Sequence, residues 1–277
     1  MTAVPDTERK LVGPTDGLFP PPGAVSLCIH AEMLRALVVK QLKLKYKRSI
    51  LGFGWSLATP VALMGIYLFV FGVVFENDRE DFPLFLLTGL LPWQFFTLAL
   101  LGGTISLVEN APLVRNVSFP RFLLPLAPVV ASLVNFVVAL GLLAVLVVAL
   151  GRPLWLNLHW LLLAIVLETL LVAGIVLALC VWDVHFRDIE QLIALLTPLL
   201  FFATPIVYDL SQVPSEYRPF VVANPLTGVM EAFHAALFDS SAPDLWPVVV
   251  AAGETAVVLA LGSWIFMRAA TRLAKEV

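Results

Sequence analysis

Two carboxylates lie within long apolar stretches of the sequence, where a charged side chain is costly. Glu168 and Glu254 are each flanked by mostly aliphatic residues. Ionisable groups inside membrane spans are functional candidates by default, because burying their charge in hydrocarbon costs free energy. The alternative is structural: each carboxyl group is protonated, or pairs with a polar group such as Asn135, and holds helices together. The sequence favours this alternative, because the predicted spans contain no Lys or Arg that could complete a relay.

A second acidic group is the segment ENDRED, Glu76–Asp81. Acidic residues in an external loop are what a membrane glycosyltransferase using a polyprenyl-phosphate sugar needs, to hold a divalent metal or to act as a base. The alternative, a solvated turn between two helices, is the favoured interpretation. No Cys or His spacing typical of a metal site occurs, and no phosphate-cradling loop is present. We therefore expect no metal and no cofactor in this chain.

The composition identifies an integral membrane protein. Hydrophobic residues make up 60% of the 277 positions and charged residues only 13%, against about half and about a quarter in soluble domains. The formal net charge is −3, which gives no global basic field for nucleic acid. Residues 1–24 are polar and rich in Pro and Gly, typical of a mobile cytoplasmic tail. Cys28 and Cys180 are expected to be reduced thiols on the cytoplasmic side.

Six apolar stretches are about as long as a membrane-crossing helix, which needs roughly 20 residues. The fifth contains two prolines, which predict a kink or a break. The predicted spans are Ser56–Phe75, Phe82–Val108, Phe122–Leu150, His159–Val181, Ile189–Tyr208 and Trp246–Met267.

The orientation follows from the distribution of cations. With the N-terminus inside, 14 of the 17 Lys and Arg residues fall in cytoplasmic segments and only Arg79, Arg152 and Arg218 fall outside. Cytoplasmic loops carry an excess of Lys and Arg. The sequence therefore predicts that both termini are cytoplasmic, in an all-α membrane protein with six transmembrane helices.

A cluster of cations precedes the first span. Ser26–Arg48 has apolar residues at helical spacing, and Lys40, Lys43 and Lys47 lie on another face. This pattern predicts an amphipathic helix at the cytoplasmic interface, with its cations towards anionic headgroups. Two alternatives remain: the cations are only a topology signal, or the alternating KLKLKYK segment is a short strand.

Three further segments have a pattern of interest. Val108–Leu126 is a polar loop competent to form a short helix, whose apolar face at Leu113, Val114 and Val117 suggests docking to a soluble partner; a plain connector is the alternative. Asp209–Leu245 predicts short helices that re-enter or lie at the outer interface. Aromatic residues in the first and fifth spans either pack or line a sugar path; they are Tyr67, Phe71, Phe201, Phe202 and Tyr208.

Taken in order, six stretches of the chain resemble the membrane permease subunit of polysaccharide-exporting ABC transporters, the family that moves O-antigens, teichoic acids, capsules and cell-wall galactans on lipid carriers. The resemblance covers roughly residues 32–267. The matching stretches are KYKRSILGFGWSLATPVALMGIYLFVFG, GLLPWQFF, ENAPLVRNVSFPRFLLPL, HFRDIEQL, FFATPIVY and NPLTGVMEAF.

The resemblance implies a multi-pass protein of the bacterial inner membrane. It would work as two copies of this chain on two copies of a separate ATP-binding cassette subunit, which would hold ATP and Mg. Residues 25–54 would form a gate helix and residues 55–277 the six-span domain. The implied gate and headgroup residues are Lys43, Lys45, Lys47, Arg48 and Trp55.

The same resemblance implies a coupling helix over Glu109–Phe119, and a second ATPase contact at Phe186–Ile189. The implied contact residues are Glu109, Asn110, Leu113, Val114, Arg115, Val117, Phe119, Phe186, Arg187 and Asp188. The five aromatic residues would face the channel, and the helices of 209–245 would cap its exit. The segment before Phe186 departs from the family, because Asp183 and His185 stand where apolar or aromatic residues are usual.

The sequence thus predicts the permease half of an ATP-driven exporter of a lipid-linked polysaccharide, without catalytic residues of its own. The alternatives are the glycosyltransferase and an exporter of the same family for a drug or a lipid. The residue usage, rich in Ala, Val and Leu, tilts the glycan slightly towards an actinobacterial galactan over an O-antigen.

Overall fold

The computed structural model describes residues 24–47, isolated positions between 54 and 70, and residues 82–116, 119–149, 157–186, 188–239 and 242–270. Within these ranges the chain is helical and has no strand. Residues 1–23, the predicted first span and the loop Glu76–Asp81 lie outside the described residues, apart from the isolated positions.

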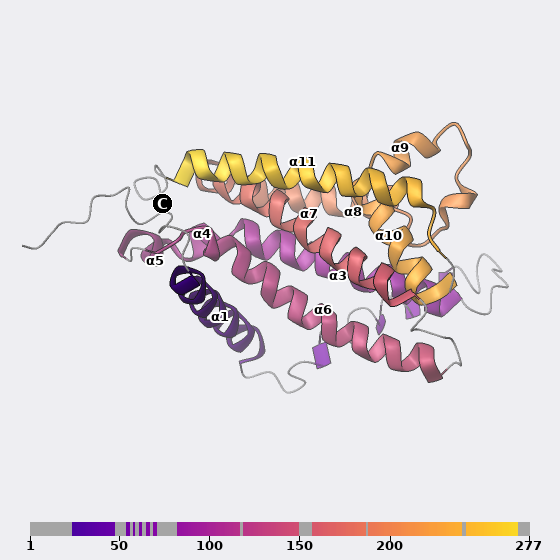
Figure 1. Ribbon diagram of the computed structural model, residues 1–277, viewed down its shortest axis with the longest axis horizontal. Helices are drawn as coiled ribbons and strands as arrows, with labels where there is room; N and C mark the ends of the chain where they lie inside the picture. Colours follow the sequence, from indigo (N-terminus) through magenta and orange to yellow (C-terminus); the bar gives the residue numbers. More distant parts are fainter. Residues whose placement is uncertain are drawn as a thin grey trace, which may run out of the picture.

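Four helices are long and apolar enough to cross a membrane, among the residues that the structure describes. They lie side by side as a bundle (Figure 1). These helices are α3 (Phe82–Thr104), α6 (Leu123–Ala149), α7 (Leu158–His185) and α11 (Leu245–Ala270). They confirm the predicted third, fourth and sixth spans to within about four residues, and most of the second.

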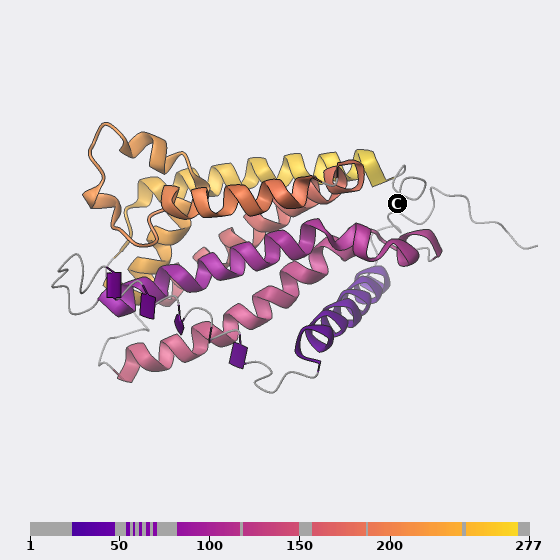
Figure 2. The same ribbon diagram turned by 180° about the vertical axis from the view of Figure 1, so that it is seen from behind.

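The predicted fifth span is a shorter helix, α8 (Ile189–Ala203), followed by an extended residue at Thr204. Pro198 lies inside this helix, whereas Pro205 lies just beyond its end. A proline following a helix cannot continue it, so the predicted break is confirmed at Pro205. At a rise of about 1.5 Å per residue, fifteen residues extend about 22 Å. Figure 2 shows α8 running along the length of the bundle.

The helices of the bundle alternate in direction, and two ends can be distinguished by what lies at each. At one end α1 (Ala24–Tyr46) lies against α6, close to the short helices α4 (Ser106–Glu109) and α5 (Ala111–Asn116) (Figure 1). We name this the α1 end. The opposite end, with α10 (Pro225–His234), is the α10 end.

Helices α7 and α11 approach each other closely because glycines lie at their crossing. A Cβ atom added at Gly174 would lie 2.7 Å from Leu259 Cα, and one added at Gly262 would collide with the Gly174 carbonyl. Small residues at such crossings let helix backbones pack closely in membranes. Both glycines lie in the C-terminal half of their helix, so the crossing holds α7 and α11 together on the side of the bundle nearer the α1 end.

Short helices cover the α10 end, as the sequence predicts for Asp209–Leu245. They are η4 (Leu210–Gln212), α9 (Arg218–Val222), α10 and the π-helical segment η5 (Ala235–Asp239). Asn224 caps α10 by accepting a hydrogen bond from Leu226 N, and Pro225 occupies the first helical position, where its missing N–H is not needed. The apolar face of α10 and η5 packs into the bundle, with Val229, Phe233 and Leu237 buried.

Candidate functional site

The predicted gate helix is α1, and its apolar stripe packs against the bundle. Val38 is buried against Ala127 and Ala131 of α6, with Leu34 and Leu42 packed beside them. The predicted helix is therefore confirmed and the alternative strand is wrong, and the apolar stripe packs against α6.

The cations of α1 face outward. Lys43 and Lys47 are exposed, and with Lys40 they line a shallow groove of about 620 Å³ on this helix. Partial burial lowers the pKa of Lys45 from its ordinary value, because an ammonium ion loses hydration there. Trp55 is exposed, and Arg48 lies outside the described residues. The groove offers positive charge at the α1 end.

One cation of α1 is tied to the predicted coupling segment. Lys40 Nζ donates a hydrogen bond to Asn110 Oδ1 at 3.0 Å, and Asn110 Nδ2 donates to the Ser106 carbonyl at 2.8 Å. Asn110 is buried, so its amide is satisfied by these two contacts. The turn between α4 and α5 is thereby linked directly to α1.

The predicted coupling helix over Glu109–Phe119 is divided between α4 and α5, with Asn110 between them. Its apolar face was expected to point towards a soluble partner, and for Val114 this is wrong. Val114 is buried with Leu107, Cys180 and Phe266, and Leu113 and Phe119 pack against the same cluster. The driving force is burial of apolar surface within the chain itself.

The surface that this segment presents outward is different from the expected one. Val108, Glu109 and Pro112 are exposed, whereas Val117 and the side chain of Arg115 lie outside the described residues. Glu109 lies with Asp183 and Glu190 around a pocket of about 400 Å³ between α4 and the turn from α7 to α8. Both predicted ATPase-contact segments therefore meet at the α1 end.

The second predicted contact lies at that turn. The Phe186 side chain is 65% exposed, Asp188 is exposed, and Arg187 lies outside the described residues. Asp183 is buried in the last turn of α7, and His185 Nδ1 lies 2.9 Å from the Val181 carbonyl. The departure from the family pattern thus places a carboxylate inside the pocket, and Phe186 is the apolar side chain presented outward.

The aromatic residues of the fifth span do not share one environment. Phe201 is 6% exposed and packs edge-to-face on Trp93 of α3, with ring centroids 5.4 Å apart, whereas Phe202 is 63% exposed. Tyr208 is half-buried and donates its hydroxyl to the Phe202 carbonyl. Within this chain Phe201 is a packing residue and Phe202 presents a free ring face. Tyr67 and Phe71 lie outside the described residues, and a channel role for these aromatics stays a prediction.

The two carboxylates within the predicted spans also differ in how deeply they are buried. Glu168 is fully buried in α7, and neither of its oxygens has a hydrogen-bond partner among the described residues. The suggested pairing of this carboxyl group with Asn135 is therefore wrong. Glu254 is only half-buried, on the side of α11 that faces a pocket at the α10 end, and its Oε2 has no partner in the described part of the chain.

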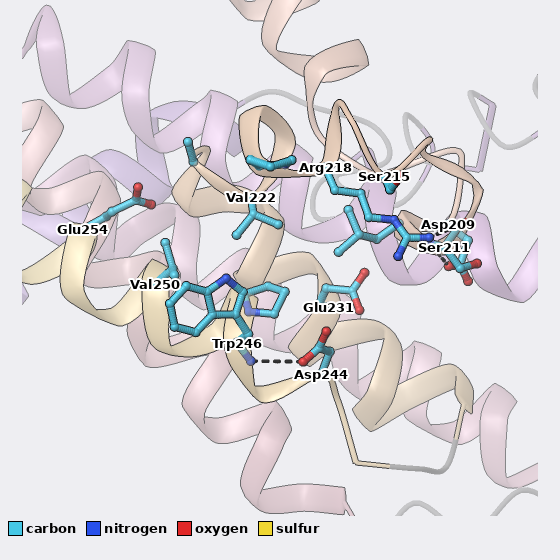
Figure 3. Close-up of a pocket in the computed structure, with 14 residues that line it drawn as sticks. Asp209, Ser211, Ser215, Arg218, Val222, Glu231, Asp244, Trp246, Val250 and Glu254 are labelled. Atoms are coloured by element: carbon cyan, nitrogen blue, oxygen red, sulfur yellow. Dashed lines mark hydrogen bonds between the residues drawn. The ribbon is translucent and has the colours of Figure 1, made fainter.

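The pocket beside Glu254 is a feature that the sequence reasoning missed. It has a volume of about 710 Å³ and lies between η4, α9, α10 and the start of α11. Figure 3 shows Arg218 and Trp246 pointing into it from opposite sides, with Asp244 and Glu231 near its rim. A signal was present: charged residues recur at 209, 218, 231 and 244 in the segment before the last span.

The bundle of long apolar helices, with a basic helix at one end, is that of a multi-pass membrane protein. The chain belongs to the ABC-2 type transporter family, whose model matches residues 32–238.

Three relatives illustrate what the chain is similar to. It is 35% identical over 242 residues to the O-antigen export system permease protein RfbA of Myxococcus xanthus. This alignment covers 86% of this chain and 92% of that protein. It is 30% identical over 204 residues to an RfbA of Klebsiella pneumoniae, covering 72% and 77%. It is 24% identical over 216 residues to the polysialic acid transport protein KpsM of Escherichia coli, covering 76% and 82%.

Proposed function

We propose that this chain is the membrane permease subunit of an ATP-driven exporter that carries a lipid-linked polysaccharide across the bacterial inner membrane. The observation that carries the proposal is the family membership over residues 32–238 together with similarity to export permeases over most of the chain. The O-antigen permeases match at higher identity than the polysialic acid transporter, which favours an O-antigen-like glycan over a galactan or a teichoic acid.

In this proposal two copies of the chain work with two copies of an ATPase subunit, which holds ATP and Mg. The α1 end is cytoplasmic, because the cationic groove on α1 and Arg268 at the end of α11 lie there and the positive-inside rule places such residues inside. Both termini are then cytoplasmic. The remaining two of the six spans are the segment Ser56–Phe75 and the short, proline-broken α8.

The α1 end provides what an ATPase partner and a charged carrier both need. Exposed Phe186, Val108 and Glu109 form a mixed apolar and acidic docking face, and the Lys40–Asn110 hydrogen bond passes a displacement of that face to α1. The cations of α1 then attract the pyrophosphate or phosphate of the lipid carrier. Coupling thus runs from the ATPase through the α4–α5 turn to the basic helix.

The direct test is co-expression with the candidate ATP-binding cassette subunits of the same genome. We expect the two proteins to co-purify, and we expect the lipid-linked glycan to stimulate ATP hydrolysis. The matched control is the same complex with the phosphate-binding Lys of the ATPase replaced by Ala. Failure of the chain to co-purify with any ATPase would overturn the proposal, and stimulation by a drug-like amphiphile instead of the glycan would reassign the substrate.

A further inference from the structure

The pocket at the α10 end has two halves of different chemistry. Its polar half lies between η4, α9 and the start of α11, and contains four carboxylates and one guanidinium, from Asp209, Glu231, Asp244, Glu254 and Arg218. A cavity of about 710 Å³ is of the size that holds a small molecule or a lipid head group.

Arg218 is held in place by the loop beside it. Its Nε donates to the Val213 carbonyl at 2.9 Å and its Nη2 donates to the Ser211 carbonyl at 2.8 Å. Its other terminal nitrogen, Nη1, has no partner among the described residues and lies on a guanidinium that lines the pocket. A fixed guanidinium with free N–H groups is suited to a phosphate oxygen.

Asp244 is also fixed, and lies near the opposite rim. Its Oδ1 accepts a hydrogen bond from Trp246 N at 3.1 Å at the start of α11 (Figure 3). The indole of Trp246 is 67% exposed and lies along the pocket. Tryptophan at the first turn of a spanning helix is typical of the membrane–water interface, so the polar half lies at head-group depth.

The second half is an apolar furrow that continues from the first along α11. It has a volume of about 600 Å³ and is lined by Pro225, Val250, Gly253, Val257 and Val258, and it shares Ala223, Val250 and Glu254 with the polar half. A Cβ atom added at Gly253 would meet nothing within 4 Å, so this glycine leaves the furrow open. A polar pocket that runs into an apolar furrow along a spanning helix has the shape of a lipid.

We propose that this pocket and furrow bind one phospholipid with a zwitterionic, amine-bearing head group, of the phosphatidylethanolamine type. The phosphate lies at Arg218, the ammonium group at Asp244, and one acyl chain in the furrow beside Val257. Glu254 lies where the two halves meet.

The presence of a fixed guanidinium at Arg218 and a fixed carboxylate at Asp244 in one pocket selects the head group. An anionic lipid such as phosphatidylglycerol brings a phosphate but no cation for the Asp244 carboxylate, which costs Coulomb energy. A choline head group carries a charge but no N–H donor, so it cannot donate hydrogen bonds to the carboxylates. A primary ammonium supplies both charge and donors.

The test is lipid binding by the intact protein in detergent, measured by native mass spectrometry with phosphatidylethanolamine, phosphatidylcholine and phosphatidylglycerol of matched chains. We expect about tenfold tighter binding of phosphatidylethanolamine than of either of the others. Asp244→Asn keeps the oxygen that caps Trp246 and removes the charge, so it lowers that preference to about threefold or less. Gly253→Leu fills the furrow and weakens all three lipids together.

Glu216→Gln is the matched control, because Glu216 is an exposed carboxylate of the same segment outside the pocket; it leaves the preference unchanged. Equal binding of the three lipids by the wild type, or an unchanged preference in Asp244→Asn, would overturn the proposal. Displacement of the lipid by soluble oligosaccharide at similar affinity would also overturn it and assign the pocket to a glycan. These outcomes do not depend on which polysaccharide the protein exports.

Discussion

The hydrogen bond between Lys40 and Asn110 joins the basic helix α1 to the α4–α5 turn. We therefore consider Lys40→Met, which keeps the length and the apolar stem of the side chain and removes its ammonium group. In this variant Asn110 Oδ1 loses its donor, while the second bond of that amide, to the Ser106 carbonyl, remains.

The free energy lost with this hydrogen bond can be estimated from the burial of its two partners. A hydrogen bond to a charged group contributes about 1.5–3 kcal/mol. The Lys40 side chain is exposed while Asn110 is buried, so water replaces the bond only in part, and the lower end of that range, about 1.5 kcal/mol, applies. Each 1.4 kcal/mol is a factor of ten in an equilibrium constant. The variant therefore raises the population of undocked α1 about tenfold.

Hydrogen exchange of the α1 amides, with the protein in nanodiscs, measures that population, because local opening limits exchange in a docked helix. We predict about tenfold faster exchange over Ala24–Tyr46 in Lys40→Met. Lys43→Met is the matched control: it removes the same charge from the same helix, but Lys43 makes no hydrogen bond with the described residues, so exchange stays at the wild-type rate. Equal acceleration in both variants, or none in Lys40→Met, would refute the link.

Three further predictions concern packing and capping. Gly262→Leu places a side chain where the α7 backbone lies and lowers the thermal unfolding temperature by the equivalent of about 2 kcal/mol or more, whereas Gly141→Ala, with nothing within 4 Å of the added atom, leaves it unchanged in the same melting assay. Phe201→Ala lowers the free energy of unfolding by about 3 kcal/mol because it empties a buried site. Phe202→Ala changes the free energy of unfolding little and reduces export, because its exposed ring guides the glycan. A larger loss of stability in Phe202→Ala than in Phe201→Ala, measured beside export in the same preparations, would contradict this. Asn224→Ala removes the N-cap of α10 and costs about 1 kcal/mol. It also removes the hydrogen bond from Asn224 Nδ2 to Thr204 Oγ1, so we expect loss of exchange protection at the start of α10 and at Thr204.

The spans could be predicted from the sequence because hydropathy alone decides them. Long, predominantly apolar runs predict α6, α7 and α11 to within about four residues. The fifth span was predicted too long, because hydropathy continues beyond Ala203 although the backbone leaves the helix at Thr204. Pro205 is the residue in the sequence that correctly predicts where this helix ends.

The site was harder to predict, because helical spacing says which residues share a face but not what covers that face. Val114 has the pattern of a docking residue and is covered by the chain's own α7 and α11. Phe201 and Phe202 are neighbours of the same type, and only their position on α8 separates the buried ring from the exposed one. The pocket around Arg218 escaped prediction, because its charged residues are spread over more than thirty positions and are brought together only by the folding of η4, α9 and α10 beside α11.

The central claim is that this chain exports a lipid-linked polysaccharide by means of a separate ATPase. Inside-out membrane vesicles containing both proteins test it most directly, with the radiolabelled lipid-linked glycan added outside and its protection from a glycan-degrading enzyme measured over time. We predict that protection requires ATP and both proteins, and that it is lost when the ATPase is inactive. Protection that proceeds equally without ATP, or without this chain, would contradict the claim.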